Sequence, residues 1–252
     1  GGTLSITADS ELTVSQGYTL TLSQNGGLVL GGNTLTISGG GSFVSGSVTL
    51  NNADSKLLLN SITLDSVSTT ADSLGLDVDA NSTVTALSVG HITPISIATG
   101  KSLSGAITVT AGSIKLNETG TLASTVTMSG GTLDADKNLT VSGALTQSGD
   151  IAIDVASGKT LSYSGAAISL GANTITLSGG GSLVSGGLTL NNADSKLLLN
   201  SITLDSVSTT ADSLGLDVDA NSTVTALSVG HITPISIAAN KTLSGGITVA
   251  AG

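Results

Sequence analysis

Three short runs of acidic and amide side chains are the residues of this sequence best suited to bind a cation. The runs are Asp77, Asp79 and Asn81, the identical Asp217, Asp219 and Asn221, and Asp134, Asp136 and Asn138. Such alternation opens the calcium loop of an EF-hand, which then needs glycine at position 6 and glutamate at position 12. Here those positions hold Ser82 and Ser88, or Leu139 and Leu145. We therefore interpret the runs as polar turns that satisfy local backbone N–H groups, with weak calcium binding as the alternative.

The two histidines, His91 and His231, occupy the same position in two copies of "GHITPI". A metal site needs three or four convergent ligands, and each histidine stands apart from any other histidine or cysteine. We interpret both as corner residues beside a strand bent by proline. The sequence therefore predicts no metal-ligating and no cofactor-binding residues.

Catalytic groups are also not found together. Enzymes that cleave polysaccharides use a cation or arginine beside a developing carbanion, or paired carboxylates with aromatic sugar platforms. This chain has no arginine, and its aromatic residues are Phe43, Tyr18 and Tyr163. We predict that it is not an enzyme and has no catalytic residues or cofactor.

Pairs of threonines separated by one residue point to a different function, ice binding, because flat ranks of threonine resemble the ice-binding faces of antifreeze solenoids. Such a face needs the pairs at one constant spacing, and their spacing here is irregular. Threonine is also favoured on exposed strands in general. Ice binding therefore stays a minor alternative. The pairs are Thr19/Thr21, Thr34/Thr36, Thr83/Thr85, Thr108/Thr110, Thr125/Thr127 and Thr174/Thr176.

Composition limits the possible partners. With seven lysines, 17 acidic residues and a net charge of −10, the chain lacks the basic clusters that bind nucleic acid or an anionic membrane surface. No apolar run approaches the 18 or so residues of a membrane span, so we predict no membrane insertion of this segment. The absence of cysteine excludes disulfides. A Cys-free, acidic chain rich in Ser, Thr and Gly is typical of bacterial extracellular surface proteins.

The elements that must position these residues are short strands. Thr or Ser alternates with Leu, Ile or Val, as in "TLTI" (34–37) and "LTV" (139–141), which is the period of a strand with one buried face. Gly, Asn, Asp and Ser occupy the turns between them. No stretch has helical apolar spacing. The sequence predicts an all-β fold.

Residues 49 to 98 recur without one change as residues 189 to 238. The wider copies, residues 31–112 and 171–252, differ at eleven of 82 positions and lie 140 positions apart. A period this long exceeds one turn of a solenoid, so each block must hold several coils. We predict one continuous β-solenoid over residues 1–252, with residues 113–170 as intervening coils, and interpret the chain as a slice of a longer repeat array.

Tandem β-sandwiches are the alternative architecture, but the short strands, the lack of an aromatic core anchor and the recurring "ADS" corners favour a parallel β-helix. In a β-helix, like residues lie above like in successive coils. If a coil holds about 20 residues, the 140-residue block makes about seven coils, rising about 34 Å.

The stretch "GGTLDADKNLTVSGALTQSGDIAIDVASGKTL" (130–161) resembles the passenger regions of bacterial autotransporters and filamentous-haemagglutinin-type adhesins. The likeness lies in degenerate coils of the form G-x-L-x-[AG]-x-x-[ND]-L-x-[VI] and covers most of the chain without a diagnostic motif. The resemblance implies a right-handed β-helix, display on the bacterial surface and a role in a stalk or in adhesion. It transfers no functional residue.

Together these observations predict a structural rod or stalk segment of a large secreted or surface-displayed bacterial adhesin, in which repetition supplies length. Its partners would be the neighbouring repeats of the same chain, with end-to-end self-association possible. Two alternatives stay open. One is a self-assembling extracellular fibre or sheath subunit, and the other is a lateral binding module for a glycan, a protein or ice.

Overall fold

A computed structural model describes residues 3–22 and 27–250, and these residues form strands and turns with no helix. The strands stack in parallel, each on the strand of the next coil, so the chain is a parallel β-solenoid. The all-β prediction is therefore confirmed. Nowhere in the described ranges is there a helix of the length and apolarity that a membrane crossing requires.

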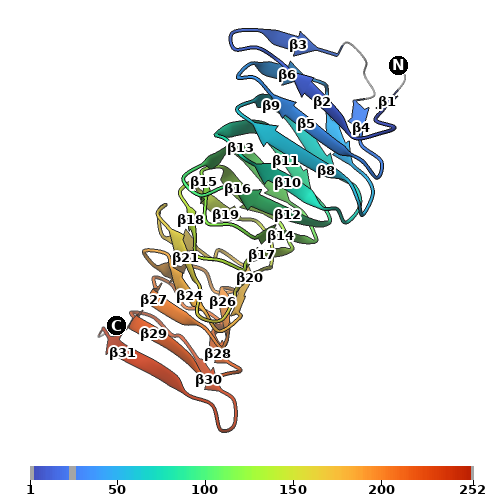
Figure 1. Cartoon of the computed structure of the whole chain (residues 1–252). Helices are drawn as coiled ribbons and strands as arrows, with labels where there is room; N and C mark the ends of the chain where they lie inside the picture. Colours follow the sequence, from blue (N-terminus) through green and yellow to red (C-terminus); the bar gives the residue numbers. More distant parts are fainter. Residues whose placement is uncertain (1–2, 23–26, 251–252) are drawn as a thin grey trace. The chain divides into compact units, whose positions relative to one another are not determined.

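The chain divides into two compact units, Gly1–Val126 and Thr127–Gly252. In the first unit, six strands run side by side in one sheet, here sheet B (Figure 1). A second sheet, sheet A, is made of the remaining strands. Sheet B contains β2 (Ser10–Thr13), β5 (Thr34–Ser38), β8 (Lys56–Asn60), β10 (Gly75–Val78), β12 (Ile92–Ile97) and β14 (Ser113–Leu116). Sheet A contains β1 (Leu4–Ser5), β3 (Thr19–Thr21), β4 (Leu28–Val29), β6 (Ser42–Val44), β7 (Val48–Leu50), β9 (Thr63–Thr69), β11 (Ser82–Val89), β13 (Ser102–Val109) and β15 (Thr121–Leu122).

The second unit repeats this construction, and β16 (Thr125–Met128) spans the boundary between the two units. Its sheet B contains β17 (Thr132–Ala135), β20 (Ile151–Val155), β23 (Thr174–Ser178), β26 (Lys196–Asn200), β28 (Gly215–Val218) and β30 (Ile235–Ile237). Its sheet A contains β18 (Leu139–Val141), β19 (Leu145–Gln147), β21 (Thr160–Tyr163), β22 (Ile168–Ser169), β24 (Ser182–Val184), β25 (Leu188–Leu190), β27 (Thr203–Thr209), β29 (Ser222–Val229) and β31 (Leu243–Val249).

The predicted period-2 alternation creates the core of each coil. In β5 and β8 the side chains of Leu35, Ile37, Leu57 and Leu59 point inward and are almost completely buried, while the residues between them face outward. Leu57 lies in register with Leu35 in one neighbouring coil and with Leu76 in the other. Like aliphatic residues therefore stack from coil to coil, which lets many small side chains fill the core without aromatic anchors.

Coil length is variable. The step between registered neighbours in sheet B is 19 residues from Leu57 to Leu76 and 25 from Leu12 to Ile37. The assumed coil of about 20 residues is thus near the lower limit of what the structure has. Turns between strands absorb the difference, since the strands that pair across coils keep their register.

Each coil bends within sheet A. Some coils use two short strands, such as β6 and β7, whereas the next coil uses the single strand β9, which pairs with both. The inward alternation of β9 breaks at Asp65 and Ser66, two successive residues that are not buried. The Asp65 carboxylate accepts hydrogen bonds from the backbone N–H groups of Ser45 at 3.1 Å and Gly46 at 2.9 Å. Asp65, at the bend of β9, therefore holds the segment that connects β6 to β7 in the neighbouring coil.

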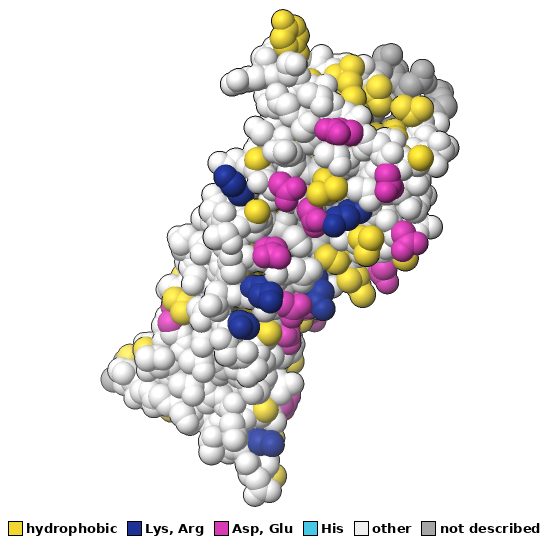
Figure 2. All heavy atoms as spheres, viewed as in Figure 1, with side chains coloured by type: hydrophobic (Ala, Val, Ile, Leu, Met, Phe, Trp, Pro, Cys, Tyr) yellow, Lys and Arg dark blue, Asp and Glu magenta, His cyan; other side chains and the backbone are white. Residues whose placement is uncertain are grey.

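The two copies fold alike, and one difference between them has a clear conformational reason. Gly100 has a φ of 73°, in the left-handed region that glycine tolerates best, and its counterpart Asn240 has a φ of 61°. Asparagine is the other residue that adopts this conformation readily. The substitution therefore preserves the turn. Over the face of the molecule in Figure 2, charged side chains of both signs lie scattered among uncharged polar atoms.

Candidate functional site

The first acidic run does not converge on one point. Asp77 lies on the outer face of β10, where its carboxylate is 2.6 Å from the Lys56 ammonium group on β8. Asn81, at the following corner, accepts a hydrogen bond from the Ser102 backbone N–H at 3.0 Å, one coil further on. Asp79 lies exposed between them. Two of the three oxygen donors are thus engaged with protein partners.

The identical run in the second copy has the same arrangement. Asp217 is 2.7 Å from the Lys196 ammonium group, and Asn221 accepts from the Thr242 backbone N–H at 3.1 Å. These lysine–aspartate pairs join residues 21 positions apart, on adjacent coils of sheet B. Sequence reasoning did not find them, because the pairing depends on a coil length that the sequence does not specify.

The third run follows the same rule at its asparagine. Asn138 accepts a hydrogen bond from the Thr160 backbone N–H at 2.9 Å, and Asp134 lies in register with Asp154 of the adjacent strand β20. These asparagines do accept backbone N–H groups, but their partners lie in the neighbouring coil, so the prediction that the runs satisfy local N–H groups of the same turn was wrong. Among residues 3–22 and 27–250, no three His, Cys, Asp or Glu side chains gather closely enough to hold a metal ion.

Corner carboxylates elsewhere in the chain perform this same task. Asp9 accepts from the Thr34 backbone N–H at 2.8 Å, and Asp150 accepts from the Thr174 backbone N–H at 2.7 Å. A backbone N–H at a coil corner has left the ladder of its sheet and needs another acceptor. Asp9 and Asp150 are therefore structural caps that join one coil to the next.

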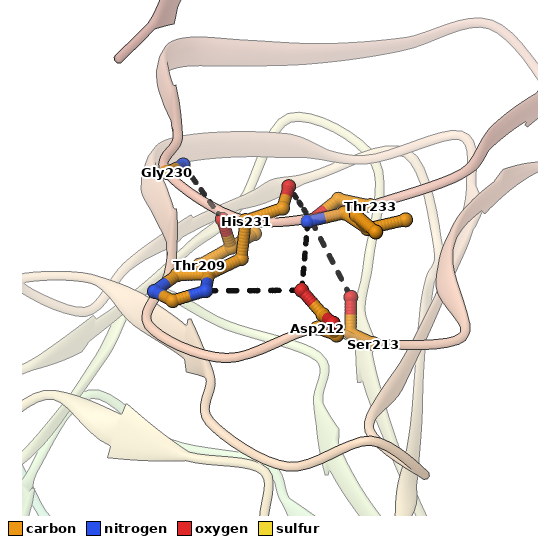
Figure 3. A network of polar contacts seen from close by, with 7 residues as sticks. Thr209, Asp212, Ser213, Gly230, His231 and Thr233 are labelled. Atoms are coloured by element: carbon orange, nitrogen blue, oxygen red, sulfur yellow. Dashed lines mark hydrogen bonds and ion pairs between the residues drawn. The ribbon is translucent and has the colours of Figure 1, made fainter. Parts of the chain in front are cut away.

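The histidine corners form the most elaborate polar cluster, and Figure 3 shows the one at His231. The Asp212 carboxylate accepts a hydrogen bond from the Ile232 backbone N–H at 3.0 Å and lies 3.8 Å from His231 Nδ1. In the first copy, Asp72 accepts from Ile92 N–H at 3.0 Å and lies 3.7 Å from His91 Nδ1. Both histidines stand at a corner directly before a proline-containing segment, as predicted.

Hydroxyl groups around His231 are also engaged in holding the corner. The Thr233 hydroxyl donates to the His231 carbonyl oxygen at 3.1 Å, and Ser213 donates to the Thr233 hydroxyl at 3.5 Å. The Thr209 hydroxyl accepts from the Gly230 backbone N–H at 3.0 Å (Figure 3). The cluster thus places a histidine and an aspartate together, while the serine hydroxyl points to threonine. Its geometry fixes a turn between two coils and provides no aligned nucleophile and base.

A shallow groove of about 610 Å³ crosses the outer face of sheet B in the second unit. It lies over Gly131, which has no side chain, and Ala152, which has only a methyl group, and its charged edges are Asp150 and Lys196. Asp150 already accepts the Thr174 N–H, and Lys196 is paired with Asp217. Both charged groups of the groove therefore already have partners within the protein.

The threonine pairs do not form one stacked rank. Thr34 and Thr36 lie on β5 in register with Lys56 and Leu58 of the next coil. Thr174 and Thr176 likewise lie beside Lys196 and Leu198. Other pairs lie in sheet A, such as Thr19 and Thr21 on β3. In the next coil, a lysine and a leucine thus occupy the positions beside each of these two threonine pairs of sheet B. No flat threonine lattice therefore forms there.

Comparisons with known proteins found no match to a family model, to a curated protein or to a solved structure.

Proposed function

We propose that this chain is a structural spacer, a stalk segment of a large secreted or surface-displayed bacterial adhesin. One observation carries the proposal: two copies of a long sequence, with fifty residues identical, fold into the same strands in the same register. In both copies equivalent inward-facing leucines lie in register on adjacent strands of sheet B. These are Leu57 and Leu76 in the first copy, and Leu197 and Leu216 in the second. A duplicated block therefore adds coils and leaves the existing ones unchanged.

The physical basis of this role is that each coil is stabilised mainly by its two neighbours. Stability in such arrays is approximately a sum of terms from each repeat and each interface between repeats. An added block brings its own interfaces between coils. The chain therefore becomes longer while the core of the existing coils stays the same. The polar side chains of the corners support this arrangement, since they are used to join coils. Bacterial origin and surface display are supported by the composition and by the resemblance described above.

The spacer role can be tested by display on a bacterial surface. Chains with one, two or three 140-residue blocks would be placed between a membrane anchor and a terminal peptide tag. We expect antibody-coated beads to reach the tag more often as blocks are added, whereas small antibody fragments reach it equally in all chains. Expression is matched by quantifying the tag after detergent extraction.

Equal bead capture for all block numbers would contradict the spacer role. Capture of cells by glycan or host-protein surfaces through untagged blocks would instead favour lateral binding. A matched control chain, in which the added block is replaced by an unstructured linker of equal residue number, separates stiff extension from mere chain length.

A further inference from the structure

One substitution between the two copies changes a turn and also completes a sequence motif. Where the first copy has Gly100-Lys101-Ser102, the second has Asn240-Lys241-Thr242. Asparagine followed by any residue except proline, and then by serine or threonine, is the acceptor motif for N-linked glycosylation. Glycine leaves this position of the first copy without the motif, whereas the asparagine of the second copy supplies the side-chain amide that would carry a sugar.

Asn240 lies on an exposed turn between β30 and β31 (Figure 1). The turn is closed by a hydrogen bond that the Lys241 backbone N–H donates to the Ala238 carbonyl oxygen at 3.0 Å. Asn240 itself is in the left-handed conformation that this turn requires. Within residues 3–22 and 27–250, no hydrogen bond involves the Asn240 side chain. Its amide can therefore react without losing a contact that holds the fold.

The open space at this turn is a property of the turn itself, because interior coils have it too. Gly100 lies in the coil of β12 and β13, on which β14 and β15 stack. A Cβ atom built on Gly100 would meet nothing within 4 Å, and the same holds at Gly158, in the turn before β21. Side chains at this position thus project from the side of the solenoid. A sugar there has room between neighbouring coils.

The chain contains the motif at four other asparagines, and each of them is held by the fold. The side-chain oxygens of Asn81, Asn138 and Asn221 accept backbone N–H groups of the neighbouring coil at 3.0, 2.9 and 3.1 Å. Each of the three directly precedes a strand of sheet A, so the rest of its motif lies in that sheet. Asn117 is half-buried at the end of β14. Asn240 is therefore the most accessible acceptor of the five.

We propose that Asn240 accepts an N-linked sugar, which a glycosyltransferase adds to the folded chain. The donor is a sugar activated through a phosphate at its anomeric carbon. The side-chain nitrogen of Asn240 attacks that carbon, a C–N bond forms, and the C–O bond to the phosphate breaks. The phosphate leaves with the electron pair of the broken bond, and the amide nitrogen gives up one proton. No group is oxidised or reduced. The inference is independent of the spacer role.

The folded 252-residue chain, incubated with UDP-glucose and a soluble N-glycosyltransferase that recognises the motif, provides the test. We expect mass spectrometry to find one added hexose per chain and peptide mapping to place it at Asn240. Asn240→Gly restores the turn residue of the first copy, so this variant should fold and lose the modification. The reciprocal Gly100→Asn completes the motif on an interior coil and should add a second hexose.

Peptides of the same chain are the control for the effect of folding. Cleavage at aspartate leaves all five motifs intact and removes the contacts between coils. We expect the peptides to be modified at several asparagines, whereas the folded chain is modified at Asn240. A folded chain that stays unmodified overturns the proposal, whatever the peptides do. Modification of the folded chain at Asn81 or Asn221 as fast as at Asn240 also overturns it, because the free turn would then give no advantage.

Discussion

Replacement of Gly75 by alanine tests the close stacking of coils most sharply. Gly75 begins β10 with a φ of +84°, and a Cβ atom built on it would lie 1.8 Å from the carbonyl oxygen of Pro94 in the next coil. At the equivalent Gly215 the distance to the Pro234 oxygen is 1.9 Å, and that same oxygen accepts a hydrogen bond from Leu216 N–H at 2.9 Å. The two coils approach through a backbone contact that only glycine allows.

The expected loss of stability in Gly75→Ala is the sum of two free-energy costs. A positive φ costs a residue with a Cβ atom about 1–2 kcal/mol. The clash must be relieved by moving Pro94 away, which breaks one or two backbone hydrogen bonds between β10 and β12 at about 1 kcal/mol each. We therefore expect Gly75→Ala to destabilise the first unit by about 3 kcal/mol in total.

Gly100→Ala is the matched control. Gly100 also has a positive φ, +73°, but a Cβ atom at this position would meet nothing within 4 Å. This variant should incur only the conformational cost, about 1–2 kcal/mol. Urea unfolding followed by far-ultraviolet circular dichroism is the suitable assay, because the chain has no tryptophan for fluorescence. Equal destabilisation by the two variants would refute the close approach of Gly75 to Pro94.

Three further predictions concern packing, charge and metal. Ile97→Ala should cost about 2–4 kcal/mol because this side chain is fully buried, whereas Ile237→Ala at the equivalent exposed position should cost less than about 1 kcal/mol in the same urea assay. Lys56→Ala should cost less than about 1 kcal/mol, since its pair with Asp77 is partly exposed, and a larger loss that persists in 1 M salt would contradict this interpretation. Chelation by EDTA followed by calcium titration should leave the melting temperature unchanged, and a rise of several degrees with calcium would show that the acidic runs bind it.

The alternation of small polar and aliphatic residues was sufficient to predict the strands and the fold class. "TLTI" and "LTV" both coincide with strands, β5 and β18, and their leucine and isoleucine or valine side chains are buried. This worked because a strand's period is local and its buried face is determined by hydrophobicity.

Features that depend on which residues meet across coils were not predictable. Asp77 and Asn81 belong to the same acidic run in the sequence, yet their partners lie in different coils. Asp77 pairs with Lys56, and Asn81 accepts the backbone N–H of Ser102. These contacts depend on coil lengths that vary between turns. Burial was not predictable from the local sequence either, because Ile97 and Ile237 lie in identical stretches, yet Ile97 is fully buried and Ile237 is 48% exposed.

The most direct test of block-wise extension is a length measurement on chains with different block numbers. Residues 57–196 can be deleted, or a further 140-residue block inserted, at equivalent points of the identical stretches, so that every junction keeps its native sequence. Small-angle scattering on each chain should show the maximum dimension changing by about 34 Å per block, because a block makes about seven coils at about 4.8 Å each. An unfolded deletion chain, or a dimension that does not follow block number, would contradict the stacking of independent blocks.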